Sequence, residues 1–300
     1  MYKDRVFEGS CVALVTPFTD HKGVWGIDFD KMGELIEDQI ANKTDAILIA
    51  GTTGESSTMF CEEHMAAIEY AVKKVANRVP VIANAGSNET RRSVELTQFA
   101  KDLGADAVLS VTPYYNKTTQ RGLFEHFKAI AGAADIPVIM YNVPSRTGMN
   151  ISPETQIALS YVHGIAGVKE CSVTQIPEVL CGAHKDYTVY SGEDGVAVAA
   201  VALGAKGVIS VIANIAPQFT HDMMMASLEG NLPVATEMQL RCTPLVKALF
   251  CETNPIPVKE GMNLLGWDVG GCRLPLVDME PKHVELLRKE MADFGLNVVR

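Results

Sequence analysis

Eight short apolar segments recur along the chain, and each is bounded by polar or turn-forming residues. These segments are Cys11 to Thr16, Ala46 to Ala50, Val79 to Ala83, Ala107 to Val111, Pro137 to Tyr141, Gly164 to Val168, Tyr187 to Tyr190 and Gly207 to Val211. Their apolar residues run continuously instead of alternating with polar ones, which is typical of parallel strands buried on both faces. The pattern therefore predicts eight buried parallel strands.

Segments whose apolar residues have the spacing of amphipathic helices lie between these strands. After Asp28, a candidate N-cap, apolar residues follow at intervals of three, four and four, and Ser152–Pro153 is a second typical helix start. Strands that alternate with helices over about 230 residues predict a (β/α)8 TIM barrel for residues 1–230. A doubly wound sheet is the alternative, but the chain lacks an early G-x-G-x-x-G motif.

The strand pattern ends at about residue 230. Beyond it, helices are predicted at Leu232 to Phe250, Asn254 to Leu265 and Pro281 to Phe294. We therefore expect residues 231–300 to form a C-terminal helical region that is added to the barrel.

Composition and charge exclude several classes of protein. The chain has 26 Lys+Arg against 36 Asp+Glu, a formal net charge of −10, whereas a general nucleic-acid binder needs a basic face. The seven cysteines include no C-x-x-C pair and the histidines no H-x-H or H-x-x-x-H pair, so we expect neither a disulfide framework nor a metal site. With no apolar run of about 18 residues and no signal-peptide pattern, we expect a cytoplasmic protein without a membrane partner.

The candidate chemistry lies where the strands end, because barrel enzymes place their active sites at that face. Lys169 follows a buried strand there, and we expect burial to lower the pKa of its ammonium group and favour the neutral amine, which can attack a carbonyl. The alternative is a lysine that reaches solvent or pairs with Glu170. Tyr141 ends the preceding strand, so its phenol can serve as a general acid/base beside Lys169, or be a core aromatic.

Two further features accompany this pair. Thr53 offers a hydroxyl relay, or stabilises a turn, between Gly51 and Gly54, whose backbone amides can face a carboxylate. Arg146 has a planar guanidinium that suits a bidentate grip on a carboxylate, although a surface role fits its position equally well.

Seven short motifs are weak individually but specific in their order and spacing. They are residues 51–55 (GTTGE), 141–144 (YNVP), 167–170 (GVKE), 191–194 (SGED), 207–210 (GVIS), 254–259 (NPIPVK) and 273–276 (RLPL). In this order they resemble the pyruvate-dependent class I aldolase family of dihydrodipicolinate synthase and N-acetylneuraminate lyase. The resemblance covers essentially the whole chain.

The resemblance implies a role for each candidate residue. Lys169 forms a Schiff base with pyruvate, so no cofactor is needed. Tyr141 is the general acid/base, linked through Thr53 to a tyrosine of a neighbouring subunit, and Tyr115 best matches that tyrosine. The residues implied to bind pyruvate are Thr52, Thr53, Gly192 and Ile209. A shared tyrosine implies a homo-oligomer, and a tetramer built from dimers is expected.

Two features resemble the synthases within this family. Sialic-acid lyases typically have Ser before Thr where this chain has Thr52–Thr53, and an apolar residue in place of Arg146. The resemblance therefore implies condensation of pyruvate with L-aspartate 4-semialdehyde to 4-hydroxy-tetrahydrodipicolinate, in diaminopimelate and lysine biosynthesis. The alternatives are a lyase for N-acetylneuraminate or a 2-keto-3-deoxy sugar acid, and an inactive barrel that binds a keto acid.

A regulatory pocket is also implied, with two departures. Lysine-inhibited synthases carry a histidine and a glutamate where this chain has Cys61 and Arg92. The other positions that resemble this pocket are Ser56, Ser57, His64, Asn88 and Tyr114. Because Arg92 should repel the ammonium groups of lysine, we expect inhibition by lysine to be weak or absent.

Overall fold

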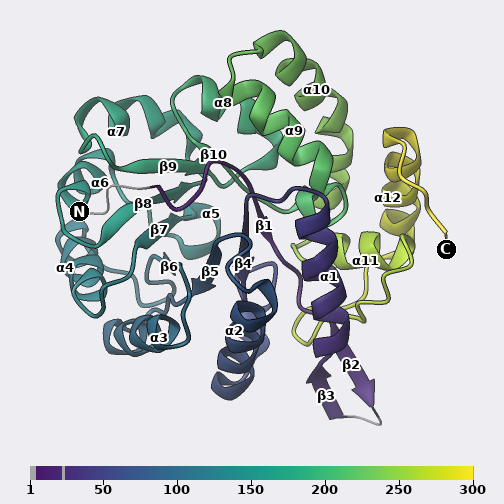
Figure 1. The fold of residues 1–300 in the computed structure, drawn as a ribbon, viewed down its shortest axis with the longest axis horizontal. Coiled ribbons are helices and arrows are strands. Elements are labelled where there is room, and N and C mark those ends of the chain that lie inside the picture. The colour runs from purple at the N-terminus through teal and green to yellow at the C-terminus, as the bar shows by residue number, and fades with distance from the viewer. Residues whose placement is uncertain (1–4, 22–23, 300) are drawn as a thin grey trace.

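Eight parallel strands close into a barrel in the computed structural model, which describes residues 5–21 and 24–299 (Figure 1). The barrel strands are β1 (Gly9–Ala13), β4 (Ala46–Ile49), β5 (Val81–Asn84), β6 (Ala107–Val111), β7 (Val138–Asn142), β8 (Ile165–Glu170), β9 (Thr188–Ser191) and β10 (Gly207–Ser210). They pair in this order, and β10 pairs with β1 to complete the circle. With helices around its outside, the barrel confirms the predicted (β/α)8 TIM barrel fold.

Helices after successive strands cover the barrel (Figure 1). They are α1 (Phe29–Ala41), α2 (Cys61–Val75), α3 (Thr90–Asp102), α4 (Gln120–Ala131), α6 (Pro153–Ser160), α7 (Ile176–Gly182), α8 (Ala197–Ala202) and α9 (Pro217–Leu228). Both predicted N-caps are confirmed. The Asp28 carboxylate accepts the backbone N–H of Lys31 at 2.9 Å, and the Ser152 hydroxyl accepts that of Thr155 at 3.4 Å.

Several strand boundaries differ from the predicted ones, by up to three residues in β1. β5 and β7 begin directly after Pro80 and Pro137, because proline has no N–H to donate to the ladder. An antiparallel hairpin of β2 (Phe18–His21) and β3 (Val24–Ile27) was not predicted. Polar residues at positions 19–21 leave β2 without the continuous apolar run by which equally short barrel strands were predicted.

Three helices follow the barrel, as predicted: α10 (Leu232–Leu249), α11 (Ile256–Leu264) and α12 (Pro281–Phe294). Side chains such as Leu245, Met262 and Leu287 belong to the same buried cluster as Val138 of the barrel. The helices therefore extend the hydrophobic core of the barrel, while the division of the chain at residue 230 stays a prediction. None of the helices in the described residues has the length and apolar character needed to span a membrane.

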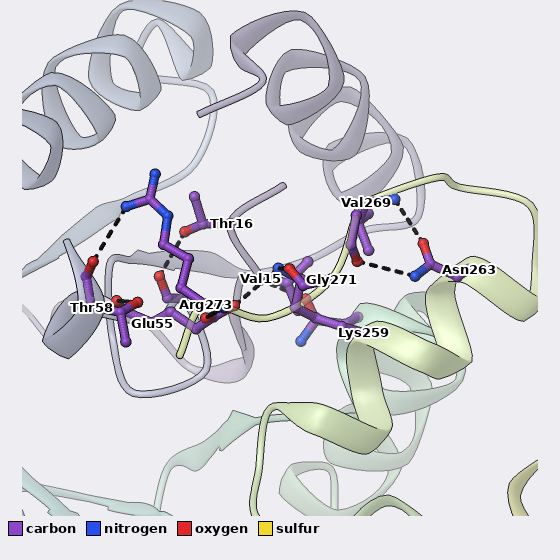
Figure 2. A network of polar contacts seen from close by, with 12 residues as sticks. Val15, Thr16, Glu55, Thr58, Lys259, Asn263, Val269, Gly271 and Arg273 are labelled. Atoms are coloured by element: carbon purple, nitrogen blue, oxygen red, sulfur yellow. Dashed lines mark hydrogen bonds and ion pairs between the residues drawn. The ribbon is translucent and has the colours of Figure 1, made fainter. Parts of the chain in front are cut away.

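A buried ion pair joins α11 to the loop after β4 (Figure 2). Lys259 Nζ lies 2.9 Å from Glu55 Oε1 and also donates to the carbonyl of Gly271 at 2.6 Å. The second carboxylate oxygen of Glu55 accepts the backbone N–H of Arg273 at 2.9 Å. Burial lowers the pKa of Lys259, and the charge of Glu55 opposes this shift. The pair thus fixes the loop of residues 51–55 against the C-terminal helices.

Replacing Lys259 should reveal how strongly this pair stabilises the fold. Lys259→Met should lower the free energy of unfolding by about 3–5 kcal/mol, because it leaves the Glu55 carboxylate buried without its partner. The matched control, Lys73→Met, breaks the exposed Lys73–Glu69 pair on α2 and should cost about 0–1 kcal/mol. Urea denaturation followed by circular dichroism measures both losses, and similar losses in the two variants would contradict this role.

Candidate active site

A cavity of about 240 Å³ opens at the carboxyl ends of the barrel strands. The predicted site residues that line it are Thr52, Thr53, Tyr141, Arg146, Lys169 and Gly192. They come from the loop after β4, from β7 and the short helix α5 (Pro144–Thr147) that follows it, from β8, and from the turn after β9. The fold thus brings together residues that are far apart in the sequence.

Strand register places Tyr141 beside Lys169. Their Cα atoms are partners in the parallel ladder between β7 and β8. Both side chains point into the barrel, and Lys169 Nζ lies 4.5 Å from the centroid of the Tyr141 ring. Glu170, the next residue, faces outward and accepts hydrogen bonds from the side chains of Asn142 at 2.8 Å and Gln156 at 2.7 Å. The alternative in which Lys169 pairs with Glu170 is therefore wrong.

The charge of Lys169 also depends on its other neighbours. Burial lowers the pKa of its ammonium group, but Tyr141 and Cys171 when ionised, together with Asp194, raise it by more. The prediction of a lowered pKa is therefore wrong, since it considered burial alone. Burial raises the pKa of Tyr141 and raises that of Cys171 to about 12, so both carry their protons near neutral pH. Asp194, whose own pKa is raised by burial, is a third neighbour whose charge favours the ammonium form.

The hydroxyl that bonds to the Tyr141 phenol belongs to Thr52. Burial raises the pKa of Tyr141, while the charge of Lys169 and this hydrogen bond from Thr52 oppose the shift. The predicted relay ran through Thr53, whose Oγ1 instead accepts a hydrogen bond from Asn254 Nδ2 at 3.0 Å. Thr52, rather than Thr53, is therefore the hydroxyl placed to exchange a proton with Tyr141.

Two cavity residues that the sequence did not reveal come from the C-terminal helical region. Phe250 and Asn254 line the cavity from the segment between α10 and α11. The backbone carbonyl of Asn254 accepts a hydrogen bond from Arg146 Nη2 at 3.2 Å. The motif at residues 254–259 was a signal for this segment, but nothing in its sequence indicates that its first side chain reaches the barrel mouth.

Gly192 lines the cavity, whereas Ile209 lies in the core of the barrel. A Cβ atom at residue 192 would lie 2.4 Å from Cys171 Sγ and 3.3 Å from the Lys169 side chain, so the site requires glycine there. Ile209 is buried inside the barrel in one cluster with Tyr141, and Val211 lines the cavity instead. The backbone role of Ile209 stays a prediction.

Comparison with known proteins places this geometry in a family. The model of the dihydrodipicolinate synthetase family matches residues 6–293. The chain belongs to that family. It is 53% identical over 291 residues to the 4-hydroxy-tetrahydrodipicolinate synthase of Acetivibrio thermocellus, which covers 97% of this chain and 98% of the relative. It is 47% identical over 293 residues to 4-hydroxy-tetrahydrodipicolinate synthase 1 of Clostridium acetobutylicum, with 97% and 99% covered.

Solved structures of family members superpose closely on this chain. The dihydrodipicolinate synthase of Aquifex aeolicus matches with a TM-score of 0.94 and 44% identity, covering 98% of this chain and 100% of its own. The chloride-inhibited synthase of Acinetobacter baumannii, solved as a complex with pyruvate, has a TM-score of 0.93 and 41% identity, with 97% and 99% covered. The barrel and the helical region are therefore both features of the family.

The tyrosine that the family resemblance assigns to a neighbouring subunit lies outside the cavity of its own chain. Tyr115 is 93% exposed and has a left-handed backbone with φ of 68°. Tyr114, beside it, is partly exposed and lines a second cavity. The contribution of Tyr115 to the active site of a neighbouring subunit, a second copy of this chain, stays a prediction.

The second cavity, of about 770 Å³, shares Thr52, Tyr141 and Arg146 with the first. The predicted regulatory residues that line it are Ser56, Ser57, His64, Asn88, Arg92 and Tyr114. Cys61 is the first residue of α2 and is exposed to solvent, so it lies outside the lining although it was predicted within this pocket. Burial, and to a smaller extent the charge of Arg92, lower the pKa of His64 and keep its imidazole neutral near pH 7.

Proposed function

We propose that this chain is a lyase that condenses pyruvate with L-aspartate 4-semialdehyde to 4-hydroxy-tetrahydrodipicolinate, in diaminopimelate and lysine biosynthesis. The observation that carries the proposal is the adjacency of Lys169 and Tyr141 in the cavity at the barrel mouth. It occurs in a chain that is 53% identical to a relative with that name. A buried amine beside a phenol can form a Schiff base and exchange protons with it. We also propose that the reaction needs no cofactor.

The reaction begins when Lys169 releases its ammonium proton to water and Nζ, now a neutral amine, attacks C2 of pyruvate. Loss of water from the resulting carbinolamine gives a protonated Schiff base, and the departing hydroxyl must receive a proton. The protonated phenol of Tyr141 lies beside the amine and is hydrogen-bonded to Thr52, so it can donate that proton. The Thr53 hydroxyl binds the pyruvate carboxylate, beside Thr52, whose own hydroxyl bonds to Tyr141.

The second half of the reaction joins the two substrates. The iminium draws electrons from C3 of the bound pyruvate. The Tyr141 phenolate, left when the departing hydroxyl took its proton, removes a proton from C3, and this gives an enamine. The enamine carbon attacks the aldehyde carbon of the semialdehyde, whose carboxylate is bound by the Arg146 guanidinium. The Tyr141 phenol protonates the resulting alkoxide to the hydroxyl. The amino group of the semialdehyde then adds to C2 and displaces Lys169, which closes the ring and frees the lysine amine. The proton released in this exchange returns to the Tyr141 phenolate.

We further propose a cytoplasmic homo-oligomer, a tetramer built from dimers. The exposure of Tyr115 supports it, because this side chain can reach another site only across a subunit boundary. Phe60 and Leu274, which are 77% and 79% exposed, border another surface cavity together with Val277. Burying such apolar side chains would stabilise a subunit contact.

Substrate comparison tests the proposed function. The purified protein should form 4-hydroxy-tetrahydrodipicolinate from pyruvate and L-aspartate 4-semialdehyde, detected by mass spectrometry, and should not cleave N-acetylneuraminate. Arg146→Ala should raise the KM for the semialdehyde about 10- to 100-fold, because it removes a charged hydrogen-bond donor, while the KM for pyruvate changes little. Cleavage of N-acetylneuraminate without condensation activity would contradict the proposal.

Inhibition by lysine is a second property of the chain that can be tested. We propose that lysine inhibits weakly or not at all, because Arg92 in the second cavity repels its ammonium groups. A lysine titration should show no half-inhibition below ~1 mM, and Arg92→Glu should increase the sensitivity to lysine. The control is Arg91→Glu, which makes the same charge change at an exposed neighbour outside that cavity lining. Half-inhibition of the unaltered protein well below ~1 mM would overturn this expectation.

A further inference from the structure

The segment between α10 and α11 places one amide side chain against a candidate substrate-binding hydroxyl. Asn254 is buried and lines the active-site cavity, although it belongs to the C-terminal helical region and not to a barrel strand. Its Nδ2 lies 3.0 Å from Thr53 Oγ1. Its Oδ1 is also buried and has no hydrogen-bond partner among the described residues. The bond to Thr53 is therefore the polar contact that orients this amide.

The chemistry of the two groups gives this hydrogen bond a direction. An amide NH2 can only donate, so Thr53 Oγ1 must accept. A threonine hydroxyl carries a single proton, and that proton is then available to an acceptor on the other side of the oxygen. Thr53 lines the cavity, so an acceptor such as a substrate carboxylate can take it.

Further contacts hold Asn254 in register with the barrel mouth. Arg146 Nη2 donates to the Asn254 backbone carbonyl at 3.2 Å. Five residues along the chain, Lys259 binds Glu55, which is two residues after Thr53 (Figure 2). Two contacts therefore join the same two segments, one at the cavity and one behind it.

We propose that Asn254 is a positioning residue. Its amide holds the Thr53 hydroxyl as a hydrogen-bond acceptor, so that Thr53 presents its proton to the carboxylate of the keto-acid substrate. The inference rests on the proposed function, because it takes pyruvate as the ligand of Thr53. It assigns to the C-terminal helical region a part in substrate binding.

Steady-state kinetics with varied pyruvate and saturating semialdehyde tests this role. Asn254→Ala should raise the KM for pyruvate about tenfold with a smaller change in kcat, because the hydroxyl loses its fixed direction. Thr53→Val should raise the KM similarly, and the double variant should be no worse than Thr53→Val alone, because Asn254 acts through the missing hydroxyl.

A reversal of the hydrogen bond gives a second readout. In Asn254→Asp the carboxylate accepts the Thr53 proton and repels the substrate, so the KM for pyruvate should rise more than in Asn254→Ala. This defect should shrink as the pH is lowered, because protonation of the aspartate restores a donor. The control is Asn263→Asp, the same substitution on α11 at a side chain that binds Val269 and Gly270, and it should leave the KM unchanged.

The outcomes separate this inference from the proposed function. If the unaltered protein forms no product from pyruvate, the proposed function and this inference are both overturned. If the unaltered protein is active and the effects of Asn254→Ala and Thr53→Val on the KM multiply, or if Asn254→Ala leaves the KM unchanged, only the positioning role is overturned. A double variant that matches Thr53→Val supports it.

Discussion

The buried pair of Glu55 and Lys259 is the interaction on which the candidate site depends. Removing two charges from water costs several kcal/mol, and the cost is offset here because each group gains a further hydrogen bond, with Gly271 or Arg273. The pair fixes the position of one segment of the chain relative to another. Glu55 ends the loop that carries Thr53, so fixing its carboxylate fixes the hydroxyls at the barrel mouth relative to α11.

Two parts of the chain therefore assemble the site, and each part positions its side chains through a different kind of contact. The ladder between β7 and β8 sets Tyr141 beside Lys169, and that arrangement needs only the barrel. The hydroxyl of Thr53 and the guanidinium of Arg146 are held by contacts with Asn254 from the C-terminal segment. In physical terms the helical region is part of the active site, and the core that it shares with the barrel keeps these contacts in register.

The sequence was sufficient for the eight barrel strands, the helical tail, and the convergence of Tyr141 and Lys169, because buried strands have a distinctive pattern and parallel strands end at one face. It did not reveal which threonine bonds to Tyr141, because the two hydroxyls are adjacent in sequence and only side-chain orientation separates them. The direction of the Lys169 pKa shift required the neighbouring charges. The contact of Asn254 with Thr53 joins residues about 200 positions apart, which local patterns do not encode.

The proposed reaction requires a covalent bond between the Lys169 amine and pyruvate in this cavity. Incubation with pyruvate and borohydride, followed by proteolysis and mass spectrometry, tests it most directly because reduction traps a Schiff base on the lysine that formed it. A pyruvate-dependent adduct is expected on the peptide that contains Lys169. An absence of adduct, or an adduct on another lysine such as Lys259, would contradict it.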